Sequence, residues 1–144
     1  MIALGADHGG YELKESIKKH LDEKGVEYKD MGCDGESVDY PLIAEKVCNE
    51  IVGKNADKGI LICGTGIGIS IAANKIKGIR AAVCTDAYTA KYTRLHNDSN
   101  VLCMGGRVTG GGVAVEMVDI FLETEFEGGR HERRVAQITA LEEK

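Results

Sequence analysis

The sequence predicts a single α/β domain in which helices cover both faces of a five-stranded parallel sheet. Short apolar runs rich in Ile, Val, Leu and Ala alternate with longer segments of helical period along the whole chain, the pattern of parallel βαβ units. The runs are apolar throughout, as expected of strands covered on both faces. The length of 144 residues suits one domain, and no linker or internal repeat divides the chain.

Five strands and six helices are expected in alternating order. The strands are predicted at residues 2–6, 26–31, 59–63, 80–84 and 100–104. The first helix, 11–24, has Leu13, Ile17 and Leu21 four residues apart, which places them on one apolar face. Further helices are predicted at residues 41–52, 68–76, 86–96, 113–122 and 133–141. The last helix follows a Gly128-Gly129 hinge and precedes no strand, so it could pack on its own domain or reach a partner subunit.

Composition and charge argue against several classes of partner. The formal net charge of −5 gives no electrostatic footprint for nucleic acid or an anionic membrane, so a phosphate ligand must be bound locally. No stretch approaches the roughly 20 apolar residues of a membrane span, and the first residues lack the basic region of a signal peptide. Without a membrane span or signal peptide, the protein is expected to be cytoplasmic. The five cysteines show no CxxC spacing, so we expect free thiols and no metal site.

Reactive side chains stand where the predicted strands end. Ligands of an open parallel sheet bind beyond the carboxyl ends of its strands. The residues at those positions, together with a group just before the last strand, are Asp7, His8, Cys63, Thr85, Asp86, Arg107, His96 and Asn97. Ordinary turn chemistry is an equal alternative for any one of them, but we interpret the group as one cluster.

A glycine-rich loop follows the third predicted strand. Gly64-Thr65-Gly66-Ile67-Gly68 would let backbone N–H groups converge at a helix N-terminus and hold an anion. The loop has no lysine for a phosphate-binding Walker sequence, and Ile69 stands where a dinucleotide fingerprint needs glycine and where a cysteine phosphatase needs arginine. Cys63 borders this loop, and its thiolate would suit a general base. The other four cysteines are interpreted as small buried hydrophobic residues.

Basic residues gather at the start of the last helix. Arg130 and Arg134 are four residues apart and would share one helical face, with His131 and Arg133 beside them. Paired guanidinium groups suit a phosphate, although a solvated basic helix end is an equal alternative. His96 could likewise be a helix-end histidine that complements the helix dipole.

At this point the motifs resemble a known family, ribose-5-phosphate isomerase B, within a group that includes the galactose-6-phosphate isomerase subunits. The matching segments run nearly from end to end and are Gly5-Ala6-Asp7-His8-Gly9-Gly10, Asp39-Tyr40-Pro41, residues 62–75 around Cys63, Arg94-Leu95-His96-Asn97-Asp98 and Glu127-Gly128-Gly129-Arg130-His131. The resemblance implies a Rossmann-like sandwich that interconverts ribose 5-phosphate and ribulose 5-phosphate in the pentose phosphate pathway. It also implies a homodimer or homotetramer, no cofactor and no metal, with active sites shared between subunits and residues 130–144 at the interface.

The resemblance also assigns roles to individual residues. Cys63 is implied to be the base that moves the proton between C1 and C2, and His96 to open the sugar ring. Thr65 and Asp7 would assist at the substrate oxygens. The remaining implied ligands are the amides of Gly64, Thr65, Gly66, Ile67 and Gly68 with Asn97 for the enediolate, and His8, Arg107, Arg130 and Arg134 for the phosphate.

Three alternatives remain open from the sequence. The substrate could be a hexose 6-phosphate, such as that of allose or galactose, because a phosphate clamp discriminates sugar length through few contacts. The glycine loop with Asp86 downstream could instead belong to a noncatalytic nucleotide-binding module. A thiol-dependent hydrolase is disfavoured because no acyl-binding motif or water-activating metal is visible.

Overall fold

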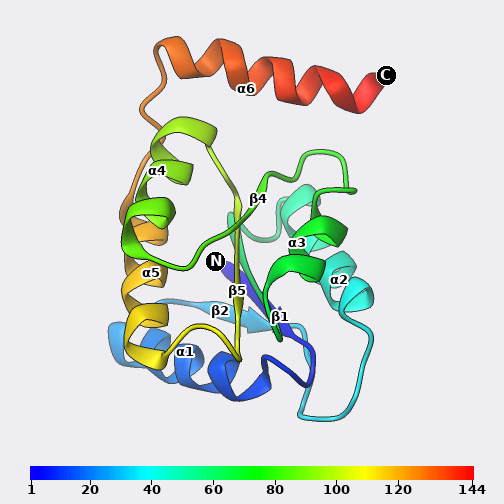
Figure 1. Cartoon of the computed structure of the whole chain (residues 1–144), viewed down its shortest axis with the longest axis vertical. Helices are drawn as coiled ribbons and strands as arrows, with labels where there is room; N and C mark the ends of the chain where they lie inside the picture. Colours follow the sequence, from blue (N-terminus) through cyan, green and yellow to red (C-terminus); the bar gives the residue numbers. More distant parts are fainter.

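The computed structural model covers all 144 residues and is an α/β/α sandwich around five parallel strands (Figure 1). The strand order is β2-β1-β3-β5-β4, with helices on both faces as predicted. The strands are β1 (Ile2–Ala6), β2 (Tyr28–Asp30), β3 (Lys58–Cys63), β4 (Ala81–Val83) and β5 (Val101–Gly105).

The three central strands form the buried middle of the sheet. β1 pairs with β3 from Ile2↔Lys58 to Ala6↔Ile62, and β3 pairs with β5 from Gly59↔Val101 to Cys63↔Gly105. Every residue of β1 and β5 is buried. The edge strands differ from the prediction, because β2 and β4 have only three residues each and are partly exposed. An edge strand pairs on one side only, so its coverage is incomplete.

Successive residues of each central strand point to opposite faces of the sheet and belong to two separate hydrophobic cores. Leu4, Ile62 and Leu102 face α1 (Tyr11–Lys24), α4 (Ala87–Asn97) and α5 (Gly111–Glu123). Leu61 and Cys103 face α2 (Tyr40–Val52) and α3 (Ile67–Ala73) on the other side. This alternation is the period of two expected of a strand covered on both faces. None of these helices has the length and apolar character needed to cross a lipid bilayer.

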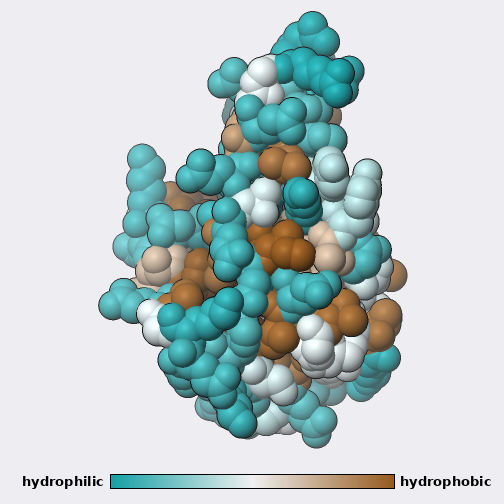
Figure 2. Space-filling model, turned by 90° about the vertical axis from the view of Figure 1, so that its left-hand side faces the viewer, coloured by the Kyte–Doolittle hydropathy of each residue, from teal (hydrophilic) through white to brown (hydrophobic).

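The last helix lies across one end of the sandwich. α6 (Arg130–Ala140), followed by a 3-10 turn at Leu141–Glu143, packs mainly against α4 at the end where the strands begin (Figure 1). Figure 2 views the molecule from the side and shows this end as a narrow, mostly hydrophilic projection above a wider body. His131 is the one buried residue of α6, whereas Ile138 and Leu141 are 45% and 63% exposed. α6 begins at Arg130, where the basic cluster of the last helix was expected and three residues before the segment that apolar periodicity predicts.

Candidate active site

Cys63 ends β3 in the middle of the sheet edge where ligands are expected. Its side chain is 5% exposed, and its Sγ accepts a hydrogen bond from the backbone N–H of Gly66 at 3.1 Å. Burial raises the pKa of Cys48 to about 12 and also raises the pKa of Cys84 and of Cys103.

The glycine loop can hold that geometry only because one residue of the loop and one residue of β5 lack side chains. Gly66 has a φ of +83°, and a Cβ atom there would lie 2.6 Å from the carbonyl carbon of Met104 in β5. A Cβ on Gly105 would meet the backbone of Thr65 at 2.6 Å. The loop therefore packs directly on the backbone of β5, which fixes the position of the Gly66 amide. Thr65 is exposed, and its Oγ1 accepts a hydrogen bond from the amide of Ile67 at 3.2 Å.

The loop after β1 lies beside the glycine loop. Asp7 is 7% exposed, and its Oδ1 accepts a hydrogen bond from the Gly9 amide at 2.9 Å. A Cβ on Gly9 would be 3.0 Å from the nitrogen of Gly64, so the two backbones are in contact. His8 follows Asp7 and is exposed. The chain thus brings a buried carboxylate to the same edge as Cys63.

Arg107, after β5, joins the same edge. Its amide donates to the carbonyl of Gly64 at 3.1 Å, and its guanidinium group lies over the open face of Gly64. Arg107 and His8 line a cavity of about 330 Å³ together with Gly9, Tyr11, Gly35 and Gly106. Arg107 carries a positive charge and His8 can carry one, and both side chains are exposed. A cavity of this size beside them suits a small anion.

The remaining predicted site residues lie at the opposite edge, so within one chain they do not join the group at the Cys63 edge. α4 begins beyond β4, runs back along the sheet and ends at Asn97 just before β5 begins. Its eleven residues, at a rise of 1.5 Å each, span about 16 Å. A helix that connects parallel strands carries its C-terminal residues to the strand-start edge, and this places His96 and Asn97 away from Cys63.

His96 belongs to a compact group of side chains where α4 meets α6. Its ring stacks on that of His131 with 4.0 Å between centroids and 13° between planes. Tyr92, one turn earlier on α4, meets His96 edge-on at 5.0 Å. Burial lowers the pKa of His131, and nearby positive charge from His96 acts in the same direction. His131 is therefore held in its neutral form near neutral pH.

Arg130 and Arg134 lie on the exposed side of α6, near this histidine pair. Both guanidinium groups are accessible, and neither takes part in an ion pair within the chain. Glu127 lies beside both stacked histidines, with its Oε2 4.0 Å from His96 Nε2 and its Oε1 3.9 Å from His131 Nε2. The strand-start edge thus offers a second group of ionisable side chains.

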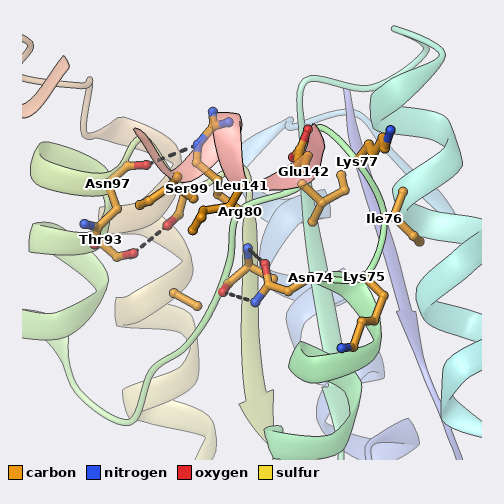
Figure 3. Close-up of a pocket in the computed structure, with 14 residues that line it drawn as sticks. Asn74, Lys75, Ile76, Lys77, Arg80, Thr93, Asn97, Ser99, Leu141 and Glu142 are labelled. Carbon is orange, nitrogen blue, oxygen red and sulfur yellow. Dashed lines mark hydrogen bonds between the residues drawn. The ribbon is translucent and has the colours of Figure 1, made fainter. Parts of the chain in front are cut away.

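A further cavity lies at the strand-start edge. It measures about 570 Å³ and is lined by residues of the α3–β4 segment, α4 and the end of α6 (Figure 3). Arg80 Nε donates to the carbonyl of Asn97 at 3.2 Å on one wall, and Ile138 and Leu141 form another. This cavity contains none of the residues at the Cys63 edge, so its size alone does not mark the chemistry.

Two residues that the motifs singled out have structural roles. Asp86 caps α4, because its Oδ1 accepts from the Thr89 amide at 2.7 Å and from the Thr89 hydroxyl at 2.9 Å. It is therefore engaged locally and not held for a nucleotide ribose. Arg94 is 6% exposed and donates to Asp98, to Ser99 O and to Thr124 O. It ties the end of α4 to the segment after α5.

Glu127 is the residue that sequence reasoning did not select as part of a site. It stands four residues before His131, a spacing that brings the two side chains to 3.9 Å because the chain turns into α6 between them. Its amide donates to the carbonyl of Leu95 at 3.1 Å, which anchors the segment beside α4. The sequence signal was the Glu-x-x-x-His spacing next to two flexible glycines.

Fold and site together define an α/β enzyme that acts on a small anionic substrate, with a cysteine, a carboxylate and backbone amides at one sheet edge. The model of the ribose/galactose isomerase family matches residues 2–138. The chain is 52% identical to ribose-5-phosphate isomerase B of Escherichia coli over 144 residues, which covers 99% of this chain and 97% of that one.

Solved structures agree in fold and in sequence. A ribose-5-phosphate isomerase B from Clostridium thermocellum superimposes with a TM-score of 0.97 at 51% identity, covering 99% of this chain and 97% of the other. The enzyme of that name from Mycoplasma genitalium, solved with bound ribulose-5-phosphate, gives a TM-score of 0.93 at 40% identity and covers 99% and 96%. The chain belongs to the ribose/galactose isomerase family.

Proposed function

We propose that this chain is an aldose–ketose isomerase that interconverts D-ribose 5-phosphate and D-ribulose 5-phosphate, a step of the pentose phosphate pathway. The observation that carries the proposal is the Cys63 sulfur, which accepts an amide hydrogen bond at 3.1 Å and stands beside a loop of backbone N–H groups. Relatives across nearly the whole chain are named ribose-5-phosphate isomerase B. The solved relative from Mycoplasma holds the ketose product.

The strand-end edge supplies the groups for proton transfer. As a thiolate, Cys63 removes the proton from C2 of the open-chain aldose, and the electron pair moves onto the carbonyl oxygen to give an enediolate. A proton then moves from O2 to O1, and the same sulfur returns its own proton to C1 while the electron pair on O2 forms the C2 carbonyl. The thiolate is regenerated and no atom is gained or lost. The amides of the Gly64–Gly68 loop stabilise the negative oxygen, and Asp7 and Thr65 assist at the substrate oxygens.

We propose that a second copy of the chain completes each site. His96 and Asn97 lie at the edge opposite Cys63, so a substrate that touches both groups needs two chains. In this dimer His96 of one chain opens the sugar ring at the partner's Cys63 edge, with Asn97 beside the enediolate. The phosphate is bound by His8 and Arg107 at the Cys63 edge and by Arg130 and Arg134 of α6.

The exposed face of α6 supports the same assembly. Ile138 and Leu141 are large apolar side chains that the chain itself leaves 45% and 63% exposed. Such residues on a projecting helix suit contact with another subunit. We therefore place residues 130–144 at the interface of a homodimer, which can pair into a tetramer. The five cysteines are all free, which fits a reducing cytoplasmic environment.

The decisive measurement is ketose formation from ribose 5-phosphate by the purified chain in excess EDTA. We expect turnover by the parent and near loss of turnover in Cys63→Ala. The matched control is Cys84→Ala, which removes a buried thiol after the edge strand β4 and should keep most of the activity. If the parent converts hexose 6-phosphates but not ribose 5-phosphate, the proposed substrate is wrong and the proposed reaction stands. Inactivity of the parent on every sugar phosphate would refute the proposal.

A further inference from the structure

Three metal-ligating side chains converge where α4, the segment before α6 and α6 itself meet. They are His96 at the end of α4, Glu127, and His131 in the first turn of α6. Their ligand atoms all lie within 4.8 Å of one another. The carboxylate of Glu127 faces both imidazoles, with Oε2 4.0 Å from His96 Nε2 and Oε1 3.9 Å from His131 Nε2.

A second observation at the same place points to a ligand. His131 is 5% exposed, and its Nε2 is buried without any hydrogen-bond partner. Leaving a buried polar nitrogen unpaired costs about 1–3 kcal/mol, so such atoms are uncommon in folded proteins. This nitrogen faces the carboxylate of Glu127 across a gap too long for a hydrogen bond. A cation between the two groups would satisfy both.

The donor set selects the class of cation. Two imidazole nitrogens and one carboxylate are ligands that Zn²⁺ and similar divalent transition metals prefer, whereas Mg²⁺ and Ca²⁺ prefer oxygen alone. Tetrahedral bonds of about 2.1 Å put ligand atoms about 3.4 Å apart, so the two separations from Glu127 must close by roughly 0.5 Å. The two histidine nitrogens lie within 4.8 Å of each other and must close by up to roughly 1.4 Å. The side chains of His96 and Glu127 are 37% and 55% exposed. Glu127 can turn toward the buried nitrogen, whereas the ring of His96 must leave its stacked position on His131 for both nitrogens to point at one ion.

We infer that His96, Glu127 and His131 bind a divalent transition-metal ion of the Zn²⁺ type, and that the bound ion inhibits the enzyme. Three protein ligands leave a fourth coordination position open to water. The inhibition rests on the proposed function, because the metal occupies the nitrogen with which His96 would open the sugar ring. Arg130 and Arg134 lie near the site and oppose a cation, which makes binding depend strongly on the negative charge of Glu127.

Binding is tested on the full-length, metal-free protein by calorimetric titration with Zn²⁺ and by the visible absorption of added Co²⁺. We expect one ion per chain, and at least tenfold weaker binding in Glu127→Gln and in His96→Asn. Two controls should bind as the parent does: His20→Asn, a histidine outside the cluster, and Cys63→Ser, which removes the other strong candidate ligand. No binding by the parent, unchanged binding in both cluster variants, or loss only in Cys63→Ser would overturn the site.

Inhibition is read separately from binding. Zn²⁺ should lower the isomerase rate of the parent, and EDTA should restore it. Glu127→Gln, compared with its own metal-free rate, should need at least tenfold more Zn²⁺ for the same inhibition. Binding without inhibition would overturn the inhibitory role. A parent without isomerase activity would refute the proposed function, and the titration would still decide the metal site.

Discussion

Gly66 and Gly25 offer a matched pair for testing whether the glycine loop is held by contact with β5. Both have left-handed backbones, with φ of +83° and +70°, but a Cβ on Gly66 would lie 2.6 Å from backbone carbon of Met104, whereas nothing lies within 4 Å of one on Gly25. Replacing either glycine by alanine in this conformation costs about 1 kcal/mol. The loss of unfolded-state freedom is the same for both variants and cancels in the comparison.

The additional cost at Gly66 comes from a clash that the sheet cannot relieve. Met104 belongs to the central strand β5, so its backbone cannot move without breaking pairs with β3. Overpacking of this kind costs about 1–3 kcal/mol, which gives a total near 2–4 kcal/mol for Gly66→Ala against about 1 kcal/mol for Gly25→Ala. Urea unfolding of the two variants and the parent measures the difference.

Activity gives the second readout of the same pair. Gly66→Ala displaces the amide that donates to Cys63 Sγ, and loss of one such donor costs about 100-fold in turnover. Gly25→Ala lies at the end of α1, away from this edge, and should keep parental turnover. Equal stability of the two variants, or parental activity in Gly66→Ala, would refute the argument that the β5 backbone positions the Gly66 amide.

Three further predictions test the shared site, the thiols and a buried ion pair. Mixing inactive Cys63→Ala with inactive His96→Asn should restore about a quarter of parental activity, because half of the reassociated dimers are mixed and each has one intact site; no recovery after verified exchange would contradict sharing. Iodoacetamide near neutral pH should modify Cys63 before Cys48, Cys84 and Cys103, because burial raises the pKa of these three thiols and keeps them protonated. Mass spectrometry identifies the modified residue, and earlier modification of any of the three buried thiols would contradict this order. Asp30→Asn should cost about 3 kcal/mol at pH 7, because Asp30 pairs at 2.7 Å with the fully buried Lys14. Although burial acts to raise the pKa of Asp30, hydrogen bonds from Lys14 and Lys18 outweigh it and lower that pKa, so the contribution is present above the unfolded value near 3.9 and is lost as the pH falls through the folded value. The stability gap between parent and variant should therefore narrow below about pH 4, and a constant gap would show that the ion pair is not its cause.

Much of the fold was predictable because the central strands are locally distinctive. β1, β3 and β5 are continuous apolar runs, and the predicted bounds differ from the observed ones by at most one residue at each end. The edge strands were predicted too long, because Val26 and Met31 flank β2 and pack against the cores without belonging to the ladder. Apolarity reports burial, and burial does not require strand pairing.

Apolar periodicity alone places the start of α6 too late, although the basic cluster from Arg130 was expected at the start of this helix. Residues 130–132 are charged or polar, so no apolar residue marks the first helical turn, and the predicted helix begins only at residue 133. The one buried residue of this helix is His131, whose burial comes from stacking on His96 and not from hydrophobicity. That contact depends on the path of residues 124–129 after α5, which local sequence does not determine.

The candidate site residues also differ in whether local sequence predicts their position. Residues that directly follow a strand, such as Asp7, Cys63 and Arg107, were placed at one edge by strand direction alone. His96 differs because it ends a helix, and a helix between parallel strands returns its last residue to the opposite edge. The span of about 16 Å along α4 exceeds the reach of a histidine side chain, so no rotamer of His96 joins Cys63 of the same chain. If His96 acts on the substrate of Cys63, assembly is therefore a condition of the chemistry, and a monomeric form should bind the phosphate weakly and lack turnover.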